Sequence, residues 1–364
     1  MSDLLEAAVP EQAEAKRLLG AALAEGPAHA YLLHGPPGVG KSSLAVAFAA
    51  VLLGGDPGRA LRRAHPDLYV LEPLGDQIRI DPIRELRRDL HMRPFEAARR
   101  VYLIFDAHLM NEDAADALLK DLEEPPDYAT ILLVADELGP LAETIRSRCQ
   151  LIPFRRLSER AVRAELERRA PGLEPDRARA FARLAAGRLD RVERLLDPAA
   201  AARRSALLEA ARAVYSEPAF DAGAAARAVL DGARERGAEA KAELEERLEG
   251  LGLPARDAEQ RVRRAQRGAE REQMLVALDE LSAWYRDLLV VGAGAPGAAV
   301  HADRLAQLEE DAIPERLPGS EAAAERVRAL WRLLEEFNLS PALALEALFV
   351  DLRRSLGQTV PATT

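Results

Sequence analysis

The chain has 364 residues, of which 48% are hydrophobic and 30% are charged, a composition typical of globular proteins. This length exceeds what one hydrophobic core usually serves, so it predicts two or three domains. Sixty acidic and 50 basic side chains give a net charge of −10, which argues against a protein that binds DNA along its whole surface. Any contact with nucleic acid is therefore expected to be local or shared with partners.

Membrane, secretory and zinc-binding features are missing from the sequence. No run of about 18 apolar residues occurs, so no membrane span is expected. The first six residues are acidic and lack the layout of a signal peptide. Cys149 is the only cysteine, which leaves no disulfide framework and no cysteine-based zinc site. We therefore expect a cytoplasmic protein without zinc.

The chain begins with a helical region and a strand. Residues 4–25 have Ala, Leu and Val spaced among charges, which predicts one or two helices with a break at Val9 and Pro10. Residues 26–29 form a predicted loop, and residues 31–34 a short apolar strand. The Ala-rich residues 43–49 predict a helix soon after this strand.

Between that strand and that helix lies the pattern G-x-x-x-x-G-K-S of a phosphate-binding loop. Its glycines allow the backbone N–H groups to face an anion, and the helix N-terminus adds a positive charge. Lys41 can reach the β- and γ-phosphates, and the Ser42 hydroxyl can ligate Mg²⁺. Because pattern and setting agree, a ligand-free Gly/Pro turn is disfavoured, and binding of ATP or ADP with Mg²⁺ is predicted. The predicted nucleotide-binding residues are Gly35, Pro36, Pro37, Gly38, Val39, Gly40, Lys41, Ser42 and Ser43.

Further strands and helices alternate up to about residue 156. Asn111 is suited to cap a helix that ends before Pro125, and Asp81 to cap a helix that begins near Pro82. Residues 78–80 are open between an edge strand and a lead into that helix. The alternation predicts an α/β domain with a parallel, doubly wound sheet over residues 1–156. The other predicted strands are residues 67–71, 101–105, 130–134 and 150–153.

The remainder of the chain reads as helical. Residues 157–200 predict a small domain of short helices, and residues 201–364 a domain of longer helices. Mixed charges over residues 231–274 predict a solvated helical hairpin rather than a partner-binding arm. Two stripes at i, i+3, i+4, i+7 predict helices with one buried face: Val327, Leu330, Trp331, Leu334 and Leu345, Leu348, Phe349, Leu352.

Five blocks of residues stand out together. They are His-Ala-Tyr-Leu-Leu-His-Gly-Pro at 29–36, His-Pro-Asp-Leu at 65–68, Ile-Asp-Pro-Ile-Arg at 80–84, Ala-Leu-Leu-Lys-Asp-Leu-Glu-Glu-Pro-Pro at 117–126 and Thr-Ile-Arg-Ser-Arg-Cys at 144–149. Together these blocks resemble the clamp-loader subunits of bacterial DNA polymerase III, which are AAA+ proteins, and most of all those of the delta prime type. The resemblance is dense over residues 12–156 and looser at 284–289 and 338–346. Among AAA+ proteins, the Leu-Glu-Glu-Pro-Pro and Ser-Arg-Cys blocks are specific to clamp loaders.

The resemblance implies a nucleotide-binding AAA+ domain, a helical lid and a helical collar that joins five subunits into a ring. It also implies a hetero-oligomer, with the delta subunit, the gamma or tau motor subunits, the sliding clamp and primer–template DNA as partners. Family members often carry a four-cysteine zinc module after the phosphate-loop helix, but residues 54–64 contain no cysteine.

Three departures from the family pattern bear on catalysis. Where motor subunits have Asp and then Glu after the third core strand, this chain has Phe105 and Asp106. Phenylalanine cannot bind Mg²⁺, and Asp106 is one methylene shorter than the Glu that orients water. The sensor position after the next strand reads Ala135 and Asp136, and Asp190 stands where motor subunits carry an arginine in the second sensor region. The resemblance therefore implies nucleotide binding with little hydrolysis.

Arg148 is the main candidate for a catalytic role. By the resemblance it is an arginine finger, which acts in trans on the ATP of an adjacent motor subunit. Such an arginine is worth roughly 10³–10⁵ in rate in other NTPases. Without the resemblance, Arg148 would be interpreted as an ordinary surface arginine. The flanking Ser147 and Cys149 favour the finger instead.

The leading hypothesis is therefore a stator subunit that helps load the sliding clamp onto primed DNA. One alternative is a gamma- or tau-like motor that hydrolyses ATP with Asp106 in place of glutamate, and Phe105 argues against it. The other is a different AAA+ remodeller or a helicase loader. The Ser-Arg-Cys block argues against this second alternative.

Overall fold

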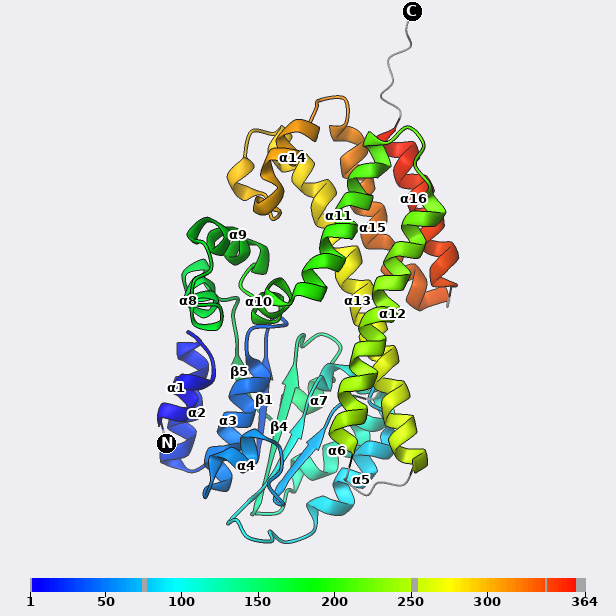
Figure 1. Cartoon of the computed structure of the whole chain (residues 1–364). Helices are drawn as coiled ribbons and strands as arrows, with labels where there is room; N and C mark the ends of the chain where they lie inside the picture. The colour runs from blue at the N-terminus through cyan, green and yellow to red at the C-terminus, as the bar shows by residue number, and fades with distance from the viewer. Residues whose placement is uncertain (1, 74–76, 250–254, 338, 358–364) are drawn as a thin grey trace, which may run out of the picture. The chain divides into compact units, whose positions relative to one another are not determined.

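The computed structural model describes residues 2–73, 77–249, 255–337 and 339–357 (Figure 1). The chain forms two compact units. Met1–Arg169 and Ala185–Arg191 make up the N-terminal unit, and Ala170–Leu184 and Val192–Thr364 the C-terminal unit. The domain boundaries expected at residues 156 and 200 stay predictions. Within the described ranges, no helix is long and apolar enough to cross a membrane.

A five-stranded parallel sheet lies at the centre of the N-terminal unit, with the order β2-β3-β4-β1-β5 (Figure 1). β2, β3 and β4 follow the chain order across the sheet, whereas β1 lies between β4 and β5. Because all neighbouring strands are parallel, each connection crosses over through other elements. The predicted doubly wound α/β sheet is confirmed. The strands are β1 (Ala30–His34), β2 (Leu68–Leu71), β3 (Arg100–Ile104), β4 (Ala129–Ala135) and β5 (Gln150–Pro153).

Each face of the sheet has its own apolar core, because successive strand residues point to opposite faces. Tyr31 and Leu33 of β1 pack with α3 (Lys41–Leu53) in one core. Ala30 and Leu32 pack in the other core with α5 (Ile80–Leu90) and α6 (Glu112–Glu123). Burial on both faces explains why the central strands are continuous apolar runs.

One of the two predicted helix caps is confirmed and the other is wrong. The Asn111 side chain accepts a hydrogen bond from the Ala114 N–H at 3.0 Å at the start of α6. The N-cap position of α5 is occupied by Arg79, and Asp81 lies inside the first turn. The carboxylate of Asp81 still stands near the positive end of the helix, which is favourable there without a capping hydrogen bond.

The segment before α5 combines the two options that the sequence leaves open. Ile78 forms an isolated parallel bridge with Met110, and Ile80 already belongs to α5. A short helix at Pro57–Leu61 was not predicted, although Asp56 caps it. The other helices of this unit are α1 (Ser2–Ala8), α2 (Ala13–Glu25), α4 (Pro57–Leu61), η1 (Ala107–Leu109), α7 (Glu143–Arg146) and α8 (Glu159–Arg169).

The C-terminal unit contains helices and no strand among its described residues, as predicted. All four residues of the 345–352 stripe are buried in its core. Val327 and Leu330 of the other stripe are buried, and Leu334 packs against them, whereas the Trp331 side chain lies outside the described part. The helices are α9 (Pro175–Ala185), α10 (Leu189–Leu196, which the unit boundary crosses), α11 (Pro198–Ser216), α12 (Ala222–Leu248), α13 (Ala255–Gly292), η2 (Pro296–Ala298), η3 (Ala302–Arg304), α14 (Leu305–Asp311), α15 (Leu317–Phe337) and α16 (Pro341–Leu356).

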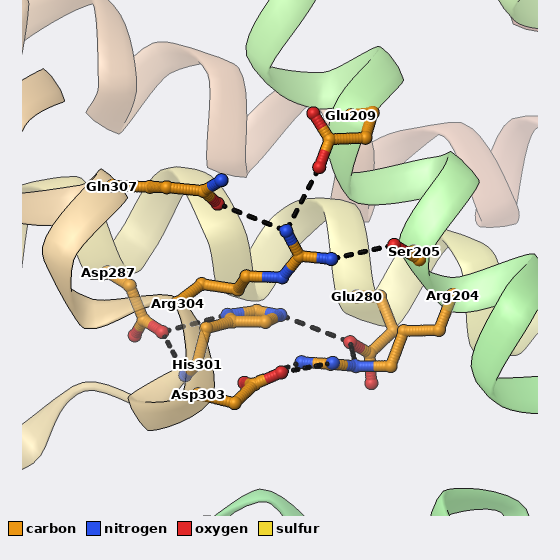
Figure 2. Close-up of polar contacts among 9 residues, drawn as sticks. All are labelled: Arg204, Ser205, Glu209, Glu280, Asp287, His301, Asp303, Arg304 and Gln307. Atoms are coloured by element: carbon orange, nitrogen blue, oxygen red, sulfur yellow. Dashed lines mark hydrogen bonds and ion pairs between the residues drawn. The ribbon is translucent and has the colours of Figure 1, made fainter.

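A buried ionic network joins α11, α13 and η3 within this unit (Figure 2). The His301 ring lies between two carboxylates, with Nδ1 2.9 Å from Asp287 and Nε2 3.1 Å from Glu280. Arg204 completes the network by donating to Glu280 at 2.9 Å and to Asp303 at 2.7 Å. Every charge in this network therefore has an opposite charge within hydrogen-bond distance, which is what burial of charge requires.

Candidate functional site

The phosphate-loop motif begins at the carboxyl end of β1 and runs into α3. Gly35, Gly38 and Gly40 have φ angles of 141°, 70° and 93°, which non-glycine residues rarely adopt. A Cβ atom on Gly35 would also lie 2.3 Å from the carbonyl oxygen of Phe154. The backbone of the loop therefore requires its glycines, independently of any ligand.

Lys41 is enclosed by oxygen atoms of its own chain. Its side chain is only 4% exposed, and its Nζ donates to the carbonyl oxygens of Gly35 at 2.7 Å and Pro36 at 2.5 Å. The same Nζ forms an ion pair with Asp136 at 2.8 Å. Burial lowers the pKa of Lys41, and the contact with Asp136 offsets only part of that effect. Phosphate oxygens would have to replace these contacts to reach the ammonium group.

The other loop residues differ in exposure. Ser42 and Ser43 are exposed at the start of α3, so their hydroxyls are accessible. Val39 is fully buried and anchors the loop in the core that also contains α3. Pro36 and Pro37 are half-buried. The loop thus presents two hydroxyls to solvent and keeps its lysine inside.

Phe105 and Asp106 follow β3 at the same edge of the sheet. The Phe105 ring is 5% exposed and packs in the α3 core, with the Arg63 guanidinium 4.8 Å from the ring centre. A side chain packed in this way offers no ligand to a metal ion. Asp106 has a positive φ of 49°, and burial, together with the nearby charge of Asp136, raises the pKa of its carboxyl.

Asp136 follows β4, which pairs with both β3 and β1, so three neighbouring strand ends meet here. Asp106, His108 and Asp136 each offer a donor atom, and these atoms lie within 4.8 Å of one another. His108 Nδ1 accepts a hydrogen bond from the Asp136 N–H at 3.3 Å. The sequence predicted neither this cluster nor the Lys41–Asp136 pair. Their only sequence signal is that each residue follows a strand of one parallel sheet.

The second sensor region lies against the phosphate loop within the N-terminal unit. The Leu189 N–H donates to the Gly38 carbonyl oxygen at 2.6 Å. A Cβ atom on Gly38 would lie 1.7 Å from a carboxylate oxygen of Asp190, so this carboxylate touches the loop. The Arg188 guanidinium pairs with the same carboxylate at 2.7 Å. The sequence identified Asp190 as a departure from the family but did not predict its contact with the loop.

Arg148 follows α7 and precedes β5, and its side chain is 32% exposed. Its guanidinium donates to the Thr144 carbonyl oxygen at 2.8 Å and pairs with Glu123 at the end of α6. Among the described residues, it makes no hydrogen bond or ion pair with Lys41 or Asp106. The polar contacts of its guanidinium in the described part of the chain are therefore with Thr144, Ser147 and Glu123.

Comparisons with known proteins find similarity to subunits of DNA polymerase III. Residues 11–158 match the family described as DNA polymerase III, delta subunit. The chain is 40% identical over 136 residues to DNA polymerase III subunit delta' of Pseudomonas aeruginosa, which covers 34% of this chain and 42% of that protein. It is 34% identical over 149 residues to the Bacillus subtilis subunit delta', covering 38% and 45%.

The tau subunit of Bacillus subtilis DNA polymerase III is also similar, with 32% identity over 169 residues, covering 40% of this chain and 28% of that protein. The chain thus spans less than half the length of each of these curated relatives. The matched segment contains the sheet, the phosphate loop and Arg148. Over residues 11–158 the chain is therefore similar to the delta' subunits of bacterial DNA polymerase III.

Proposed function

We propose that this chain is a stator subunit of a bacterial clamp loader. It supplies Arg148 to the nucleotide site of a neighbouring motor subunit and hydrolyses little or no nucleotide itself. Its partners are the delta and gamma or tau subunits, the sliding clamp and, through the assembled complex, primer–template DNA in the cytoplasm. The proposal extends the delta prime-type match of residues 11–158 to the activity of the whole chain.

The contacts that the Lys41 ammonium group makes are the main support for this proposal. A motor subunit needs this ammonium group on the phosphates, whereas here Gly35, Pro36 and Asp136 surround it. The Asp190 carboxylate beside Gly38 adds negative charge where a phosphate would bring more. Nucleotide binding is therefore weak, because it has to displace contacts that the chain already makes.

The residues present fit a nucleotide in part. AAA+ proteins in general bind nucleotides with Mg²⁺, and the backbone of the loop has the required turns at its glycines. Bound Mg²⁺ would neutralise phosphate charge, and the side chains that could hold it are Ser42 and Asp106. Because Phe105 is not an acidic residue, the group of side chains that could bind Mg²⁺ has one carboxylate fewer than in motor subunits. We infer that the loop can hold ATP or ADP but does not support efficient hydrolysis.

The contacts of Arg148 are weak enough for its side chain to turn toward a partner subunit. Its guanidinium is part-exposed, and its pair with Glu123 is a surface contact in which the glutamate is about half exposed. Surface ion pairs contribute about 0–1 kcal/mol, so turning the guanidinium toward a phosphate costs little. The contact with Thr144 keeps the side chain extended along α7 until then.

The test is to assemble the chain with motor subunits, clamp and primed DNA and to compare ATP hydrolysis with that of the Arg148→Ala variant. We expect hydrolysis at the site that receives Arg148 to fall by roughly 10³-fold or more. Arg155→Ala is the matched control, because Arg155 is 85% exposed and pairs only loosely with Glu14 at 3.6 Å. An Arg148→Ala complex that hydrolyses ATP like the control would show that the finger role is wrong.

The chain alone separates the stator from the motor alternative. A stator binds nucleotide weakly and turns it over negligibly. Rapid Mg²⁺-dependent hydrolysis by the isolated chain, abolished by Lys41→Ala, would instead establish a motor subunit. This measurement does not involve Arg148, so its outcome is independent of the finger test.

A further inference from the structure

The outer halves of α12 and α13, residues 234–249 and 255–272, form what we name the distal hairpin. The two helices lie side by side (Figure 1). The core of the C-terminal unit includes Ala233 on α12 and Met274 on α13 but no residue of the distal hairpin. Among its described side chains, the buried apolar ones are Val262 and Ala269. The predicted helical hairpin is thus confirmed in its helices, while the turn at 250–254 lies outside the described residues.

The distal hairpin contributes little to the core. Burying one valine and one alanine stabilises by about 3 kcal/mol at most, whereas ordering each residue costs about 1–2 kcal/mol of conformational entropy. Charge pairs within a helix add only about 0.2–0.5 kcal/mol each. Apolar packing therefore contributes little to the stability of these two helix segments, and most of their surface faces away from the core.

Three arginines form a stripe on the outward side of α13. Arg261, Arg264 and Arg267 follow one another at a spacing of three residues, which places them along one side of the helix. No acidic residue occurs between Glu259 and Glu270. Arg261 and Arg267 are exposed and Arg264 is half-buried. We name these three residues the arginine stripe.

The arginine stripe lacks ion pairs, whereas several other basic residues of the hairpin have them. Across the described part of the chain, no carboxylate lies within ion-pair distance of Arg261, Arg264 or Arg267. Neighbouring bases are paired on their own helices, as Arg236 with Glu243 at 3.3 Å shows on α12. Glu239, Glu243 and Glu259 pair with other basic residues, and the stripe keeps its positive charge.

We propose that the arginine stripe binds the phosphate backbone of double-stranded DNA. The stripe spans six residues, or about 9 Å along the helix axis. Phosphates of one DNA strand follow at about 3.4 Å along the duplex axis, so this length covers about three of them. Guanidinium groups suit phosphate because they donate two parallel hydrogen bonds. Such contacts are independent of base sequence.

Two other kinds of anionic partner fit the hairpin less well. Protein interfaces have an apolar or aromatic centre, and helices that bind a membrane surface insert Trp, Phe or Leu. None of the large apolar side chains exposed in the described part of the chain lies on the distal hairpin. A purely ionic stripe on a chain of net charge −10 also agrees with the expectation of a local nucleic-acid contact.

The choice of DNA as the source of the phosphates rests on the proposed function, since that complex acts on primed DNA. The experiment measures binding of the full chain to a labelled DNA duplex by fluorescence anisotropy between about 50 and 200 mM salt. For three contacts, the plot of log K against log salt should have a slope of about −3. Changing all three arginines to alanine should bring that slope close to zero and weaken binding at least tenfold at the lowest salt.

A matched variant with Arg179→Ala, Arg234→Ala and Arg354→Ala removes the same charge from exposed arginines. In the wild type these three arginines are paired with Asp176, Asp231 and Asp351. The variant that lacks them should therefore bind DNA as the wild type does. Circular dichroism should show both variants folded, because alanine favours helices. Equal affinity and slope for the stripe variant and the control would overturn the proposal, as would absence of binding by the wild type.

Vesicles of anionic lipid and polyglutamate serve as competitors in the same assay. Stripe-dependent binding to either one in preference to DNA would also overturn the proposal. The assay contains no nucleotide and no motor subunit, so it can fail while the Arg148 test succeeds. Failure of the Arg148 test with intact stripe-dependent DNA binding would refute only the proposed function.

Discussion

Each unit contains a buried group of ionisable side chains, and the two groups differ in how their charges are compensated. In the N-terminal unit, burial lowers the pKa of Lys41 and raises the pKa of Asp106, so both groups are shifted toward their neutral forms. In the C-terminal unit, burial acts on His301 and Glu280 in the same sense, but their hydrogen bonds outweigh it. The net result is a raised pKa for His301 and a pKa of about 2 for Glu280.

The difference separates a structural network from a candidate site. Around His301, donors and acceptors alternate from Asp287 to Asp303 and every charge is paired (Figure 2). Around Lys41, two carboxylates face one lysine, and the charge of Asp136 disfavours the charged form of Asp106. Groups held against their preferred charge state occur more often at functional sites than in ordinary cores. This supports the reading of the Lys41 group as an altered nucleotide site.

The largest expected effect comes from breaking the network around His301. Asp287→Ala removes one of the two carboxylates that contact the buried His301 imidazolium, which should lower the free energy of unfolding of the C-terminal unit by about 3–5 kcal/mol. Asp231→Ala removes an exposed partner of Arg234 instead and should cost at most about 1 kcal/mol. Both tryptophans of the chain, Trp284 and Trp331, lie in this unit, so tryptophan fluorescence in urea reports on it. Equal losses for the two variants would contradict the comparison.

The pH dependence of the same unfolding free energy tests the direction of the shifts. The lowered pKa of Glu280 gives stability that is present above its ordinary value of 4.5 and is lost as the pH falls toward 2, by about 3 kcal/mol. Because the pKa of His301 is raised, its contacts contribute their full stabilisation below pH 6.5. This stabilisation is lost as the pH rises through the raised pKa of His301. Urea titrations should therefore show a plateau between these limits.

Glu280→Gln is the variant that checks the acid limb of this profile. It should flatten the loss of stability on the acid side. An alkaline limb of reduced depth should remain, because Asp287 still contacts His301 while the charge of Glu280, which also raises the pKa of His301, is removed. An acid limb of unchanged depth in this variant would assign the loss to other carboxylates of the unit.

The smallest expected effect lies at the Lys41 group. Because the pKa of Asp106 is raised above 3.8, its charge disfavours folding at neutral pH, and Asp106→Asn should stabilise the N-terminal unit by up to about 1 kcal/mol. Asp116→Asn, at an exposed position of α6, should change stability by less than about 0.5 kcal/mol. Hydrogen exchange of the α3 amides measures both. A destabilised Asp106→Asn would mean that Lys41 supports this carboxylate more than burial opposes it.

The α/β sheet, the phosphate loop and the helical C-terminal part could be predicted from the sequence, because the signal for each lies in contiguous residues. Apolar runs at 101–105 and 130–134 are long enough to be strands and are apolar on both faces, and the glycines of 35–40 mark their own backbone angles. The Asn111 cap was predictable for the same reason. Asp81 was misplaced by two positions, since a helix start is defined by backbone hydrogen bonds that a cap residue only favours.

The pairing of charged side chains, in contrast, could not be predicted, because it depends on how distant segments pack. Lys41 and Asp136 come from different strands and pair because β1 and β4 are neighbours in the sheet, which no local pattern encodes. Asp190 reaches Gly38 through a contact between segments far apart in the chain. Such contacts set burial and charge compensation, and these depend on every element around a group rather than on its neighbours in sequence.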